Sequence, residues 1–123
     1  MRLPTLVRVF ATVGAVVMVV GVVFAANPDD VAKLKATGSC AGCDLMGAEL
    51  PGLQAPNADL TNANLSNVSF YAANLSGANF TGATLDGANL KMVNLTGAQG
   101  LIFGTSTTDE RTICPNGSSG PCE

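Results

Sequence analysis

The four cysteines are the residues of this chain whose type and spacing best fit a chemical role. Cys40 and Cys43 form a Cys-x-x-Cys pair, while Cys114 and Cys122 follow much later with seven residues between them. A Cys-x-x-Cys pair at the start of a helix in a βαβ unit is typical of thiol-disulfide exchange, but the surrounding sequence indicates no such unit. Zinc binding by four thiolates is the other alternative, and the spacing of the second pair is poor for it. We therefore favour structural disulfides with local pairing, Cys40 with Cys43 and Cys114 with Cys122, among three connectivities.

Other catalytic groups are scarce. The sequence has no His, no Trp and one Tyr, so acyl-transfer triads and most zinc sites lack their usual base or ligand. The carboxylates of the central region are Asp44, Glu49, Asp59 and Asp86. Their spacing gives no close pair for acid-base work. The sequence thus predicts a protein that is not an enzyme and that binds no cofactor or metal.

The first 25 residues have the pattern of a secretory signal peptide. Arg2 and Arg8 make the start positive, residues 9–26 are uncharged and rich in Val, and Val-Phe-Ala at 23–25 fits a small-residue cleavage site. The alternative is an uncleaved membrane anchor, because an apolar stretch of about 18 residues can just span a bilayer. Export to the periplasm or the extracellular space also agrees with disulfide formation.

The charge balance argues against a nucleic-acid partner. The formal net charge is −3, and loss of a leader with its two arginines makes it more negative. The remaining cations are Lys33, Lys35, Lys91 and Arg111. They are too few and too scattered for a surface that follows a phosphate backbone. Membrane contact is expected through the N-terminal segment alone, if that segment is not cleaved.

The architecture must come from a period of five residues. Leu or Phe recurs at every fifth position from Leu45 to Leu95, with Ala55 as the exception, and the residue two positions earlier is usually Ala. Helices and strands present periods of 3.6 and 2.0. A period of five belongs to neither, so it indicates a repeat architecture.

The units resemble those of the pentapeptide-repeat family. Ala-Asn-Leu-Ser-Gly at 73–77 carries the resemblance, and variants of it fill residues 43–102 as twelve units. The resemblance implies an all-β solenoid, a right-handed quadrilateral β-helix in which four units make one coil and the central and minus-two residues face inward. Twelve units then give about three coils. The unit at 53–57 exchanges its large and small inner residues, and we expect a local distortion at Pro56.

Both flanks of the repeat are expected to cover its open ends. Residues 26–42 predict an N-terminal capping helix followed by the Cys-x-x-Cys turn. Asn27 suits the N-cap, Pro28 the first turn and Gly38 the end of this helix, and Val31 and Leu34 would face the first coil.

The C-terminal flank, residues 103–123, predicts a cap and a polar, disulfide-stapled tail. Leu101, Ile102 and Phe103 would close the last coil before it. Stacking of positions 20 apart also places Gly100 in an inner column, above Leu60 and Phe80.

One outer wall of the expected solenoid differs from the rest. The units centred on 50, 70 and 90 stack Pro51, Tyr71 and Lys91 in one outer column, with Met92 in the next. Aromatic residues and Met are enriched in interfaces. These four residues are the candidate contact with a partner.

The function most consistent with the sequence is a noncatalytic exported scaffold or protein-interaction module. Its partner would be a protein or another component of the cell envelope, and self-association into a homo-oligomer is compatible with the sequence. Two alternatives stay open. The family resemblance offers a DNA mimic that inhibits a type II topoisomerase, and Cys40 with Cys43 offers a thiol-disulfide redox protein.

Overall fold

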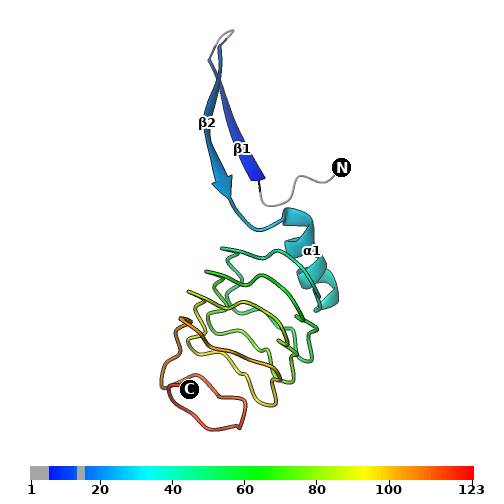
Figure 1. Ribbon diagram of the computed structural model, residues 1–123, viewed down its shortest axis with the longest axis vertical. Coiled ribbons are helices and arrows are strands. Elements are labelled where there is room, and N and C mark those ends of the chain that lie inside the picture. Colours follow the sequence, from blue (N-terminus) through cyan, green and yellow to red (C-terminus); the bar gives the residue numbers. More distant parts are fainter. Residues whose placement is uncertain (1–5, 14–15) are drawn as a thin grey trace.

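The computed structural model describes residues 6–13 and 16–123. Its first elements are β1 (Leu6–Val13) and β2 (Val16–Phe24), which pair as an antiparallel two-stranded sheet, and α1 (Pro28–Thr37). From there the chain winds into a stack of coils, with α1 at one end of the stack and the C-terminus at the other (Figure 1).

The stretch that the sequence assigns to a leader lies largely in β1 and β2. Across residues 6–13 and 16–123, none of the helices combines the length and the apolar content needed to cross a bilayer. Arg2, which begins the leader pattern, lies outside the described residues. The signal peptide and its cleavage stay predictions.

Main-chain hydrogen bonds between residues about twenty positions apart hold the coils together. The N–H of a central residue donates to a carbonyl in the next coil, as from Leu45 to Asn64 (2.9 Å) and from Leu65 to Thr84 (2.8 Å). Parallel bridges join Asp44 to Asn64 and Asn64 to Thr84. This spacing corresponds to four five-residue units in each coil.

Each unit bends through a tight turn, which explains its Asn and Gly residues. The N–H of Ala48 donates back to the carbonyl of Leu45 (2.9 Å), and Gly47 between them has a φ of 72°. Positive φ at the third turn residue is the mark of a type II turn and favours Gly or Asn. The residue before the centre adds an Asx bond, as where the Asn74 side chain accepts the Ser76 N–H (3.1 Å).

The core is a column of central residues with smaller side chains beside them. Every central residue from Cys40 to Leu95 is at most 3% exposed. The minus-two residues are also buried or half-buried, with Leu53 and Ala83 the half-buried ones packed against the core. The inward faces predicted from the period of five are therefore confirmed.

The repeat begins one unit earlier than predicted, while the central positions keep the predicted register. Cys40 and Gly42 already donate to the carbonyls of Asp59 and Thr61, both at 2.7 Å, so the first unit is 38–42. At the other end Gly100 is exposed, and its φ is 67°. The inner place assigned to Gly100 was wrong, although Gln99 just before it still pairs with Asn79 in the ladder.

The distortion expected at Pro56 is absent. The neighbouring donors keep their inter-coil bonds, Ala55 to Asn74 (2.9 Å) and Asn57 to Ser76 (2.7 Å). The residue after the centre uses its N–H for the Asx bond and not for the ladder. Proline, which has no N–H, therefore costs the ladder nothing there, and the Gln54 side chain donates to the Gly52 carbonyl instead of closing an Asx turn.

The helix α1 follows the capping signals in the sequence. The Asn27 side chain accepts the Asp29 N–H (3.0 Å), and Gly38, with φ of 74°, ends the helix by donating to the Leu34 carbonyl. Leu34 is fully buried, and Val31 is half-buried against the core. The inward face of α1 is therefore the predicted one.

Asp30 adds a contact between α1 and the first coil that the sequence did not reveal. In inner coils the residue before the centre donates to the preceding coil, as from Asn64 to Cys43 (2.8 Å). The first coil has no preceding coil, and the Asp30 carboxylate accepts the Asp44 N–H instead (3.0 Å). A side-chain oxygen thus replaces a main-chain carbonyl at this edge.

The C-terminal tail forms part of a fourth layer. Leu90 donates to Thr107 and Leu95 to Ile113, both at 2.8 Å, although the tail has no five-residue period. Side-chain oxygens again replace carbonyls, because Asp109 accepts the Met92 N–H (3.1 Å). Ile102 is 72% exposed, so its predicted role in closing the last coil was wrong.

Leu101 and Phe103, on either side of Ile102, are half-buried against the core. Side chains of an extended chain alternate between two faces. Three consecutive residues therefore cannot all cover the coil, and the central one points outward.

The hydrogen bonds of Asp109 predict acid sensitivity of the fourth layer. Partial burial raises the pKa of this carboxyl, but hydrogen bonds from the Met92 N–H, the Thr112 hydroxyl and the Arg111 N–H outweigh it, so the pKa is lowered from 3.8. A lowered pKa stabilises the fold above the unfolded-state value of about 4, and that stability is lost as the pH falls through the folded-state value. Urea unfolding of wild type and Asp109→Asn should show a steeper loss of stability for wild type below about pH 4. Parallel pH profiles would contradict the assignment.

Candidate functional site

The cysteines form the two local disulfides favoured by the sequence. The Cα atoms of Cys40 and Cys43 are 5.4 Å apart, and those of Cys114 and Cys122 are 5.6 Å apart. Cys40 occupies a central position of the repeat and Cys43 a minus-two position, so both face the core and are 0% and 5% exposed. Exchange requires a thiolate to reach a disulfide sulfur, and burial blocks that approach.

The two disulfides should differ in their response to reductant. Cys122 is half-buried, so we expect mild reduction to open Cys114–Cys122 well before Cys40–Cys43. Alkylation of the native protein followed by peptide mass mapping measures the order. Early labelling of Cys40 and Cys43 would instead support the redox alternative.

The outward carboxylates stay separate. Glu49, Asp59 and Asp86 are exposed and Asp44 is half-buried. The Thr61 hydroxyl, followed by the Thr61 N–H, lowers the pKa of Asp59 by hydrogen bonding. Within the described part of the chain, no three Cys, Asp or Glu side chains gather as metal ligands. These contacts are those of solvated turns.

The structure brings the candidate contact residues together on one wall. Gly52 donates to the carbonyl of Tyr71 (2.8 Å), and Ala72 donates to that of Lys91 (3.0 Å). These bonds stack Pro51, Tyr71 and Lys91 in adjacent coils, at the strand spacing of about 4.8 Å. Tyr71 is 43% exposed. We call this surface the tyrosine wall, made of Pro51, Tyr71, Lys91, Met92 and Arg111.

Arg111 also belongs to the tyrosine wall, and no sequence pattern indicated this position. Its Nη1 atom lies 3.9 Å from the Met92 sulfur. The bond from the Met92 N–H to Asp109 holds this part of the tail against the third coil. Thr107 and Ile113 pair with positions 18 and 19 residues earlier, so extrapolation of a 20-residue stack could not place Arg111.

The tyrosine wall is where the turn position with positive φ carries residues other than Gly or Asn. Ten of the twelve units carry Gly or Asn at the turn position with positive φ, and the exceptions are Ala72 (59°) and Met92 (61°). An L-residue with a Cβ in this conformation loses roughly 1–2 kcal/mol. Both exceptions lie on this wall. The backbone there therefore keeps an unfavourable φ at residues that carry a side chain larger than that of Gly.

The tyrosine wall also carries two cations without counterions. Lys91 and Arg111 are exposed, and neither forms an ion pair with another residue of the described chain. The remaining cations of residues 26–123 are Lys33 and Lys35 of α1. All positive charge of the coils and tail is therefore on one face.

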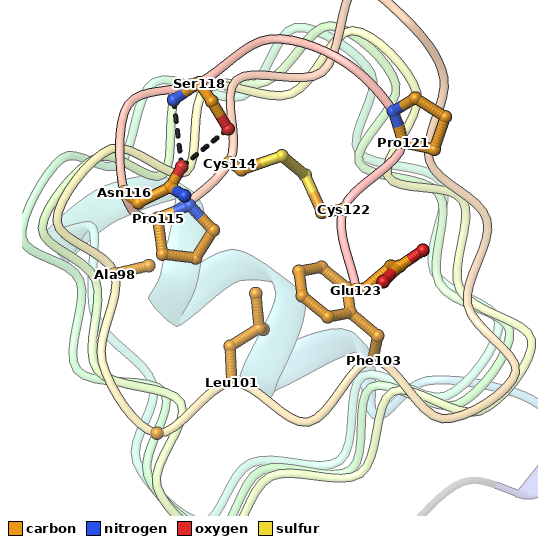
Figure 2. A pocket seen from close by; sticks show the side chains of 11 residues that line it. Ala98, Leu101, Phe103, Cys114, Pro115, Asn116, Ser118, Pro121, Cys122 and Glu123 are labelled. Carbon is orange, nitrogen blue, oxygen red and sulfur yellow. Dashed lines mark hydrogen bonds between the residues drawn. A yellow bond between two sulfur atoms is a disulfide. The ribbon is translucent and has the colours of Figure 1, made fainter.

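A second candidate surface is the hollow at the C-terminal end of the stack, shown in Figure 2. Its volume is about 510 Å³. Leu101 and Phe103 point into it, and the Cys114–Cys122 disulfide lies across from them. The lining of the hollow combines the apolar side chains with polar residues such as Asn116, Ser118 and Glu123.

Comparison with known proteins agrees with this geometry. Residues 63–98 match the family model described as pentapeptide repeats, in eight copies. No curated protein matches the chain in sequence.

Similar solved structures include a pentapeptide repeat protein from the cyanobacterium Cyanothece 51142, at 24% identity over 70% of this chain and 97% of that one, with a TM-score of 0.34. Another comes from the Arabidopsis thaliana thylakoid lumen, at 25% identity over 58% and 61%, with a TM-score of 0.29. Central residues buried every five positions, hydrogen bonds twenty positions apart and the match over 63–98 lead to one conclusion. Residues 63–98 are pentapeptide repeats, and the neighbouring coils follow the same five-residue pattern.

Proposed function

We propose that this protein is a noncatalytic exported scaffold that binds another protein of the cell envelope through the tyrosine wall. Its coils would be a right-handed quadrilateral β-helix capped by α1. The observation that carries the proposal is the strain at Ala72 and Met92. Strained backbone tends to concentrate at functional sites, and here it accompanies the exposed Tyr71 side chain.

The alternatives have less support. A redox role needs an accessible sulfur, whereas Cys40 and Cys43 are buried in the first coil. A DNA mimic needs a dense acidic surface, whereas the outward carboxylates of the repeat are Asp44, Glu49, Asp59 and Asp86, with Lys91 among them. Neither alternative accounts for the tyrosine wall.

Export is tested first, by mass spectrometry of the protein recovered from its host. A mature chain that starts near Ala26 supports the proposal. A full-length chain confined to the cytoplasm would overturn export.

Binding is tested with the purified labelled protein and an envelope preparation from the same host. We expect saturable binding that falls about tenfold for Tyr71→Ser, since large aromatic residues dominate contact energies. Thr81→Ser is the matched control, because Thr81 follows a central residue on a different wall. Equal binding by the two variants would contradict the assignment.

A further inference from the structure

We propose that the tyrosine wall recognises an acidic peptide segment of its partner that also carries apolar residues. This inference rests on the proposed function and adds the chemistry of the partner. Lys91 and Arg111 are exposed and lack counterions in the described chain, in a protein whose formal net charge is −3. Carboxylates of a partner would supply the missing opposite charge, and complementary charge determines which partners are accepted.

The arrangement of the wall indicates a peptide and not a lipid surface or a nucleic acid. Anionic membranes are usually bound by clusters of four to eight basic residues, and nucleic acids by more phosphate contacts than two cations can make. Here two cations accompany the flat ring of Tyr71 and the Met92 side chain. Tyr71 and Lys91 occupy adjacent coils, so an extended segment running along the stack would meet the ring first and the charge next.

Acids lie near both ends of the tyrosine wall. Asp109 is the acid closest in the ladder, and its carboxylate is held by the N–H groups of Met92 and Arg111. Glu49 belongs to the first coil, beside Pro51, at the opposite end of the wall from Arg111. Glu110 is also exposed and directly precedes Arg111, so this end of the wall carries both acids and the two cations Lys91 and Arg111.

The test measures binding of the full chain to two labelled peptides of equal length, one alternating Glu with Leu and the other alternating Lys with Leu. We expect saturable binding of the Glu peptide, weakened about tenfold by Lys91→Thr and by Arg111→Thr and reduced by added salt. Lys33→Thr and Lys35→Thr are the controls, because they remove the same charge from α1. Circular dichroism checks that each variant is folded.

Three results would overturn the inference: no binding of the Glu peptide, equal binding of the Lys peptide, or equal loss in the α1 controls. Saturable binding to anionic vesicles without peptide binding would also overturn it, in favour of a lipid surface. The proposed function fails separately. If the envelope preparation binds the wild type and loses binding with Tyr71→Ser while the Glu peptide does not bind, the result would support the scaffold proposal and reject an acidic peptide as the partner.

Discussion

Replacing Phe70 by Ala should lower the free energy of unfolding by about 3–5 kcal/mol, because truncation of a buried aromatic side chain removes its burial and leaves a cavity. Phe70 is a central residue of the middle of the stack and is fully buried, between Leu50 and Leu90 in the coils on either side. The coil is narrow, so the neighbouring side chains have little freedom to fill the space.

The adjacent residue provides the control. Tyr71 is of nearly the same size but is 43% exposed and turned outward, so Tyr71→Ala should cost less than about 1 kcal/mol. Urea unfolding followed by circular dichroism measures both. Losses of equal size at Phe70 and Tyr71 would contradict the inward and outward assignment of the repeat.

Replacing Gly100 by Ala should destabilise the protein by about 2–5 kcal/mol, which combines two effects. Its φ of 67° is unfavourable for a residue with a Cβ, at roughly 1–2 kcal/mol. An added Cβ would also lie 2.7 Å from the main-chain N and Cα atoms of Thr81. Overpacking of this kind costs a further 1–3 kcal/mol or so, because backbone must move to relieve it.

Gly47 separates the two effects. Its φ is 72°, and an added Cβ would meet no atom within 4 Å. Gly47→Ala should therefore show the conformational cost alone, about 1–2 kcal/mol. Thermal or urea unfolding of both variants gives the difference. If Gly47→Ala were as damaging as Gly100→Ala, the close approach of Gly100 to Thr81 would be wrong.

The period of five predicted most of the fold because each position of a unit has one physical role. Central residues such as Leu65 fill the coil, Asn74 closes an Asx turn, and Gly47 accepts a positive φ. The signals around Asn27 and Gly38 likewise predicted the bounds of α1. These roles depend on neighbours in sequence or on a fixed 20-residue stack.

The ends of the solenoid could not be predicted in the same way. Cys40 is the first central residue, but its unit looks like part of the flank because it begins with Gly-Ser and carries no Leu or Phe. The bonds from Asp44 to Asp30 and from Met92 to Asp109 depend on where loops of irregular length return. Arg111 lies on the tyrosine wall because such a loop places it there, and the loop does not follow the five-residue period.

Photocrosslinking in the host cell tests most directly the central claim that the tyrosine wall is the face that contacts a partner. A photoreactive phenylalanine analogue is placed at position 71, and in separate variants at 61 and 81, which follow central residues on another wall. We expect one discrete adduct from position 71 and none from 61 or 81. No adduct from 71, or equal adducts from all three positions, would contradict it.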